Sequence, residues 1–277
     1  MWYSSLDEGL AALKQDKPRL TALVLCETSF LVAETVDHLS NAGFERLIAI
    51  GPGAKAAPER DGLIGAPADI ANADTRAAVI NKLVAAAAGR WMLVCFNGEF
   101  LFYPYRESRR VQDFVEFLSW ERRPAAMGYA VDIYSDALGR EEDSFSLEDV
   151  YFDTEGWYGF ERGEKLAEVF GGLGWRFEEF TPREMTRVNR PALFWADPAV
   201  PIRGDLWFED DVYNAISCPW HNNPTFALMS VRRATALRRH PNFSAGVKSF
   251  MWPCSEKFSW SSQQLLKHGV IEAGQWL

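Results

Sequence analysis

Trp91-Met-Leu-Val-Cys-Phe-Asn-Gly-Glu-Phe-Leu-Phe-Tyr-Pro104 is the segment of the chain that says most about its fold. Its first six residues, 91–96, form an unbroken apolar run, which predicts a buried strand. The small and polar segment Asn97-Gly98-Glu99 then interrupts the run, and a second apolar run follows it. We therefore expect a lone carboxylate, Glu99, to lie between two strand-like segments.

The sequence before this stretch alternates between two hydrophobic patterns. Apolar runs at 20–25 and 46–50 predict two more strands, and helical periodicity predicts helices over 30–39 and 69–88. Thr28-Ser29 and Asp69 are the N-caps expected for these helices. Strands that alternate with helices through short connections pair in parallel, which predicts an α/β fold. In such sheets ligands bind beyond the carboxyl ends of the strands.

The sequence after this stretch changes in composition. A helix over 108–122 and a strand over 127–134 continue the α/β pattern, and residues 229–239 read as a helix. Eight of the eleven tryptophans lie after residue 150, among short aromatic segments and turns. We therefore expect an α/β core over 1–150 and an aromatic-rich, irregular portion over 151–277, packed on that core.

Composition limits the classes of function. The chain has 277 residues, 48% of them hydrophobic, and a net charge of −9. An acidic chain argues against nucleic acid as a partner, because phosphate neutralisation needs a basic face. The four cysteines form no Cys-x-x-Cys pair, no signal peptide is visible, and no apolar run is long enough to span a bilayer. We expect a cytoplasmic protein without a transmembrane segment.

Five segments in order resemble the family-2-like glycosyltransferases of the GT-A fold, in the bacterial branch with an Asp-x-Asp-Glu-Phe strand end. They are residues 26–44, 47–53, 90–101, 111–118 and 125–135. The resemblance implies a Rossmann-related, mostly parallel sheet flanked by helices. It makes residues 1–150 a GT-A-like nucleotide-sugar-binding core and residues 151–277 an acceptor or interaction portion. It also implies a nucleotide-sugar donor, a glycan or lipid-linked acceptor, and Mg²⁺ or Mn²⁺ as cofactor.

The sequence departs from that family at all three strand ends that face the nucleotide and the metal. Lys-Asn-Glu is replaced by Cys26-Glu27-Thr28, Asp-Asn-Gly by Gly51-Pro52-Gly53, and Asp-x-Asp by Phe96-Asn97-Gly98. Divalent cations of this kind require hard carboxylate oxygens. Only the trailing Glu99 supplies one, so we assign no metal ligand.

Two sets of candidate site residues follow. The donor side is expected to contain Glu27, Asn97, Glu99 and Arg106, the last because binding without a metal would need basic residues near Glu99. The catalytic candidates are Asp132, a carboxylate within an apolar strand; His221, followed by Asn222-Asn223; and Asp210, within three consecutive acids.

Two functions are compatible with these residues. The first is sugar transfer from a nucleotide donor to a glycan or lipid-linked acceptor in surface polysaccharide synthesis. The second is a non-catalytic glycan-binding or assembly protein on a GT-A scaffold, which has lost the Asp-x-Asp motif. A homo-oligomer is compatible with the second, because the aromatic half could serve as an interface.

Overall fold

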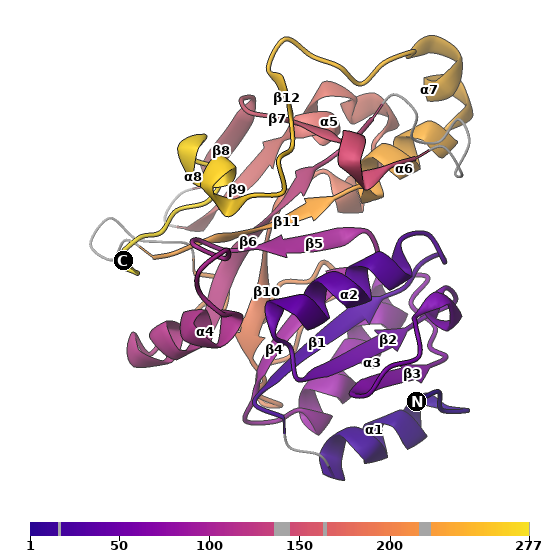
Figure 1. The fold of residues 1–277 in the computed structure, drawn as a ribbon, viewed down its shortest axis with the longest axis vertical. Coiled ribbons are helices and arrows are strands. Elements are labelled where there is room, and N and C mark those ends of the chain that lie inside the picture. Colours follow the sequence, from indigo (N-terminus) through magenta and orange to yellow (C-terminus); the bar gives the residue numbers. More distant parts are fainter. Residues whose placement is uncertain (16–17, 136–144, 163–164, 216–222, 277) are drawn as a thin grey trace.

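The computed structural model describes residues 1–15, 18–135, 145–162, 165–215 and 223–276. The principal element is one eight-stranded sheet with the order β3-β2-β1-β4-β10-β6-β11-β5 (Figure 1). The strands are β1 (Leu20–Leu25), β2 (Arg46–Ile50), β3 (Leu63–Ala66), β4 (Trp91–Phe96), β5 (Glu99–Phe102), β6 (Ala125–Asp132), β10 (Asn189–Trp195) and β11 (Phe226–Ser230). The predicted α/β class and the mostly parallel sheet are confirmed.

The helices cover both faces of the sheet, as the alternation of strand side chains requires. Along β1, the even-numbered residues pack with α2 (Val32–Ala42) and α4 (Val111–Trp120). The odd-numbered residues pack instead with α1 (Leu6–Gln15) and α3 (Ala73–Ala86). A third cluster joins β5, β6 and β11 to α6 (Arg232–Arg239), α7 (Pro241–Gly246) and α8 (Ser262–Lys267).

The second half of the chain is less irregular than expected, because it contributes β10 and β11 to the main sheet (Figure 1). It also forms the hairpin β8 (Trp157–Arg162) and β9 (Lys165–Gly171), and the ribbon β7 (Tyr151–Asp153) with β12 (Ser255–Lys257). The short helix α5 (Gly172–Arg176) and the 3₁₀ turns η3 (Leu147–Asp149), η4 (Glu178–Phe180) and η5 (Arg183–Met185) also belong to this half, whereas the 3₁₀ turn η1 (Ala54–Ala56) lies between β2 and β3. The sheet thus takes strands from both sides of residue 150.

Several local predictions need correction. Met229 and Ser230 end strand β11, so the helix predicted over 229–239 begins only at Arg232. The N-cap of α3 is Asn72, whose side chain accepts a hydrogen bond from the Thr75 amide, and not Asp69. α2 begins at Val32 after Leu31 in the left-handed region, so Thr28-Ser29 precede the helix without capping it.

Strand direction brings distant residues to one edge of the sheet. β1, β4, β6 and β11 run the same way, so Glu27, Asn97, Asp132 and the start of α6 all lie at or just beyond their carboxyl ends. β10 runs antiparallel to both β4 and β6, so its first residues lie at this same edge. Arg190 of β10 is thereby placed beside the end of β4.

Candidate functional site: an arginine-lined cavity at the carboxyl edge of the sheet

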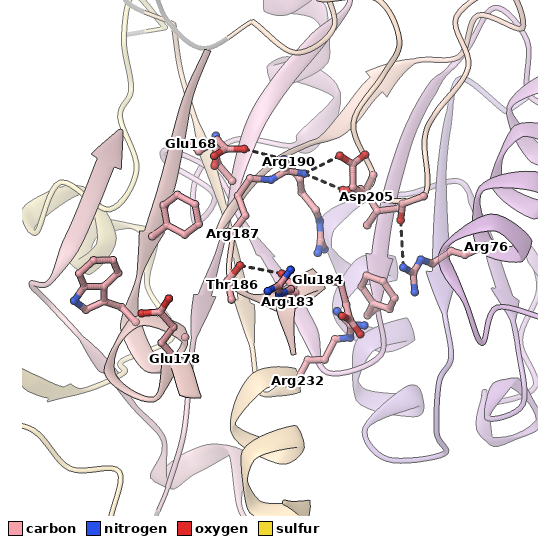
Figure 2. Close-up of a pocket in the computed structure, with 17 residues that line it drawn as sticks. Arg76, Glu168, Glu178, Arg183, Glu184, Thr186, Arg187, Arg190, Asp205 and Arg232 are labelled. Atoms are coloured by element: carbon pink, nitrogen blue, oxygen red, sulfur yellow. Dashed lines mark hydrogen bonds and ion pairs between the residues drawn. The ribbon is translucent and has the colours of Figure 1, made fainter. Parts of the chain in front are cut away.

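A cavity of about 950 Å³ opens at this edge (Figure 2). The end of β4, the helices α3 and α5, the first residues of β10 and the start of α6 all contribute to its wall. Its charged lining residues are five arginines and four carboxylates: Arg76, Arg183, Arg187, Arg190, Arg232, Glu168, Glu178, Glu184 and Asp205. Small-molecule pockets are usually lined mainly by apolar side chains, so this number of charged side chains is unusual.

Three of these arginines surround one aromatic ring, that of Phe96. The Cζ atoms of Arg232, Arg190 and Arg76 lie 3.8, 5.3 and 5.8 Å from the ring centroid. Figure 2 shows all three side chains pointing into the same part of the cavity. A guanidinium group stacks favourably on an aromatic face, so the ring supports cations that would otherwise repel one another.

Two carboxylates hold two of these arginines in place. Arg232 donates to Glu27 through Nε and Nη2, each at 2.6 Å. Arg190 donates to Glu99, which is 1% exposed and also accepts a hydrogen bond from the Phe96 amide at 2.8 Å. The sequence-predicted Glu27 and Glu99 therefore lie at the site, where their structural role is to orient the arginines.

Arg76 has a different environment. It is 7% exposed, and its Nη2 donates to the Gly204 carbonyl at 3.2 Å. Within the described ranges no carboxylate pairs with it. Burial lowers its pKa, and the nearby Arg232 guanidinium lowers it further. Arg76 is thus a buried cation without an ion pair among these residues.

A second group of charges lies toward the β8–β9 hairpin. Arg187 lies between Glu168 and Asp205 (Figure 2), with N–O distances of 3.7 and 3.6 Å. Its guanidinium also covers the Trp207 ring, with Cζ 4.3 Å from the ring centroid. Burial lowers the pKa of Arg187. This group links β9 to the loop at 204–207 and forms one wall of the cavity.

Asn97 lies at the expected strand end, but its polar atoms bind the protein. Its Oδ1 accepts from the Glu27 amide at 2.9 Å, and its Nδ2 donates to the Phe30 carbonyl at 2.8 Å. Gly98 follows with φ of +76°, and a Cβ there would lie 2.6 Å from a Val231 methyl carbon. The Asn97-Gly98 pair therefore joins β4 to the β1–α2 connection and to α6.

Asp132 ends β6 close to the cavity, where it is fully buried. It pairs with Arg233 at 2.5 Å and accepts a hydrogen bond from the Leu173 amide at 2.8 Å. Burial raises its pKa, although Arg233 opposes that effect. It lines a small cavity of about 40 Å³, which shares Arg190 and Arg232 with the large one. Asp132 thus joins β6, α5 and α6.

The remaining predicted residues lie elsewhere. Asp210 is exposed in a turn, where its Oδ1 accepts from the Val212 amide at 2.8 Å, and it does not line the cavity. Arg106 covers the Phe102 ring at 4.9 Å and contacts His38, so it is also outside the cavity lining. His221 lies outside the described residues.

The residues at the strand end do not fit a divalent metal. Phe96 has no ligating atom, both polar ends of Asn97 are in use, and Glu99 already accepts from Arg190 and from a backbone amide. Among the described residues no group of three or more His, Cys, Asp or Glu side chains could hold a metal ion. The metal implied by the resemblance therefore has no ligand set at this place.

Sequence reasoning missed the arginines that line the cavity. Arg232 comes two residues after the last residue of β11, and Arg190 is the second residue of β10. The sequence feature that could have indicated Arg190 and Arg232 is that each lies beside an apolar, strand-like run. Arg76 lies within helix α3, and no pattern distinguishes it from a surface arginine.

Comparisons with known proteins add no assignment: no protein-family model matches the chain, and no curated protein matches it significantly. No helix in the described part of the chain is both long and apolar enough to cross a membrane.

Proposed function

We propose that the chain is a glycosyltransferase-like protein of the GT-A type, which binds a nucleotide-sugar donor in the arginine-lined cavity. The observation behind this proposal is the convergence of Arg76, Arg190 and Arg232 at the carboxyl edge of a mostly parallel sheet. Ligands of such sheets bind at that edge. Guanidinium groups are the side chains best suited to phosphate, because their planar fork donates two hydrogen bonds at once.

The size of the cavity supports a ligand of this class. A volume of about 950 Å³ lies at the upper end of the range of about 300–1,000 Å³ for small-molecule sites. Such a site accommodates a nucleoside diphosphate together with its sugar. The acceptor in this proposal is a glycan or lipid-linked sugar of surface polysaccharide synthesis.

Glu184 is the carboxylate best placed to activate the acceptor. It is exposed, it lines both the large and the small cavity, and it makes no ion pair within the described ranges. In the proposed transfer the acceptor oxygen attacks the anomeric carbon and the bond from that carbon to the diphosphate breaks. The acceptor proton moves to the Glu184 carboxylate. Asp132 and Glu99 are less suited, because arginines already neutralise both.

A non-catalytic glycan-binding protein is the second candidate. It is favoured by an exposed aromatic pair beside the cavity, Trp175 and Tyr158, which are 45% and 47% exposed with ring centroids 5.2 Å apart. Trp175 also lines the cavity. Aromatic faces of this kind stack on sugar rings in water, so glycan could bind here without turnover.

Isothermal titration with UDP- and GDP-sugars, each in Mn²⁺ and in EDTA, tests the first proposal. We expect at least one nucleotide sugar to bind below millimolar concentration, and Arg232→Gln to weaken that binding. Arg60→Gln is the matched control, because Arg60 pairs with Asp37 and is not among the residues that line the cavity. No binding of any nucleotide sugar at millimolar concentration would reject the enzyme. Glycan binding on an array would then support the second candidate.

A further inference from the structure

The strand end at residues 96–98 places a ring and an amide where the resembling enzymes hold a metal ion. We infer that the guanidinium groups of Arg76, Arg190 and Arg232 themselves bind a diphosphate there, and that this site takes its ligand without a divalent cation. The inference deepens the proposed function and rests on it for the identity of the organic ligand. The diphosphate group is the chemistry that the site recognises.

Each arginine retains donors that the protein does not use. A guanidinium has five N–H groups. Arg232 gives Nε and one Nη2 hydrogen to Glu27, which leaves Nη1 available. Arg190 uses Nη2 on Glu99, and Arg76 uses Nη2 on the Gly204 carbonyl. Neither of these two arginines uses Nη1 within the described part of the chain, so that nitrogen is available on each, whereas their Nε atoms are buried and lack a hydrogen-bond partner there.

The charges around Phe96 do not balance. Three guanidinium groups surround the ring, and two carboxylates, Glu27 and Glu99, pair with two of them. Glu184 interacts electrostatically with Arg76 but makes no ion pair with it. Buried charges are normally paired, and a buried polar group without a partner is unfavourable. A bound anion would supply the missing partner.

The donors are also held in position before a ligand arrives. Glu99 is buried and fixes Arg190, Glu27 fixes Arg232 with two bonds, and the Phe96 ring supports both guanidiniums from one side. Donors that need no rearrangement bind a developing or existing negative charge most effectively. A divalent ion would be repelled by the same three cations, so the two modes of binding exclude one another.

Titration with inorganic pyrophosphate and with UDP, in EDTA and in Mg²⁺, tests the inference. We expect both ligands to bind in EDTA at least as tightly as in Mg²⁺, because Mg²⁺ in solution competes with the guanidinium groups for the same diphosphate oxygens. Arg76→Gln should weaken pyrophosphate binding at least about tenfold, because a charge-assisted hydrogen bond is lost. Arg76→Lys keeps the positive charge but loses the planar guanidinium, so its affinity for pyrophosphate should lie between those of the unsubstituted protein and Arg76→Gln. Arg60→Gln, with the same change of charge elsewhere, should bind as the natural protein does.

Glu27→Gln separates the arginine mode from a metal mode. Its side chain is about a third exposed, so the substitution is tolerated, and thermal unfolding verifies the fold of every variant. Glutamine keeps one oxygen that can accept from Arg232 and so hold it in position, while the negative charge that competes with the ligand is removed. Pyrophosphate binding in EDTA should therefore be unchanged or tighter. Binding that requires Mg²⁺, or a tenfold loss in Glu27→Gln, would overturn the inference.

The outcomes also distinguish this inference from the proposed function. Metal-free binding of pyrophosphate without binding of any nucleotide sugar would support the arginine site and reject the sugar donor. Binding of a nucleotide sugar only in Mn²⁺ would support the sugar donor and reject the metal-free arginine site.

Discussion

Glu99 is expected to be one of the residues on which folding depends most, although it belongs to the site. Its carboxylate is 1% exposed and accepts from the Phe96 amide at 2.8 Å, from the Ser230 hydroxyl at 3.4 Å and from Arg190. Glu99→Gln preserves the shape of the side chain and removes the charge. The Arg190 guanidinium then remains buried without its counterion.

The expected loss of stability follows from that pair. Opposite charges about 4 Å apart interact by about 4 kcal/mol at an effective dielectric constant of about 20. Removing one partner of a buried pair costs about 3–5 kcal/mol, because the other charge stays desolvated. Glutamine keeps an oxygen that can accept from the Phe96 amide, so we expect about 3 kcal/mol. That is a large share of a total stability of about 5–15 kcal/mol.

Urea unfolding, followed by the fluorescence of the eleven tryptophans, measures this loss. Glu116→Gln, an exposed position on α4, is the matched control and should change the free energy of unfolding by less than about 0.5 kcal/mol. The double variant Glu99→Gln/Arg190→Met should recover part of the loss, since it removes the unpaired charge. A loss below about 1 kcal/mol in Glu99→Gln would refute the reasoning.

Three further substitutions test other parts of the structure. Gly98→Ala should reduce the free energy of unfolding in urea by about 2–4 kcal/mol, because φ is +76° and the new Cβ would lie 2.6 Å from a Val231 methyl carbon. Gly156→Ala is the control: its φ is +87° but the space around it is open, so it should cost only about 1 kcal/mol. Asn97→Ala should cost about 2 kcal/mol, because it removes two hydrogen bonds to backbone groups at 2.9 and 2.8 Å, and an equal urea midpoint would contradict their importance. Burial lowers the pKa of His38 to about 3, below the value of about 6.5 in an unfolded chain. Between these two pH values the unfolded state therefore binds more protons than the folded state. The free energy of unfolding consequently falls as the pH drops below about 6.5. His38→Gln should reduce that slope by up to about 1.4 kcal/mol per pH unit between pH 5 and 6, and an unchanged slope would show that His38 is not buried in its neutral form.

Sequence patterns were most reliable where local chemistry decides the outcome. The apolar runs at 20–25, 46–50 and 91–96 became β1, β2 and β4 with the predicted limits. Short, predominantly apolar runs of this kind are buried as strands, and their alternation with helices favours parallel pairing. The prediction at 229–239 was wrong for its first residues, because a short apolar run that leads into a helix resembles a helical turn.

The residues of the site were harder to predict. Glu27, Asn97 and Glu99 could be placed at the edge of the sheet, since they follow or adjoin predicted strands. Their roles could not, because each depends on a partner far away in sequence: Glu27 on Arg232, and Glu99 on Arg190. A carboxylate that holds an arginine and one that holds a metal look the same in a sequence.

Local sequence patterns were thus enough to predict an α/β protein with its candidate site at the carboxyl edge of the sheet, and to show that the strand end at 96–98 lacks metal ligands. Which groups lie there instead follows from the tertiary fold. β10 is antiparallel to both β4 and β6, and this direction brings Arg190 to the end of β4. The start of α6 brings Arg232, and α3 brings Arg76, to the same aromatic ring. Local patterns specify which residues are buried and in which element, whereas the pairing of strands that are distant in sequence specifies which charges meet.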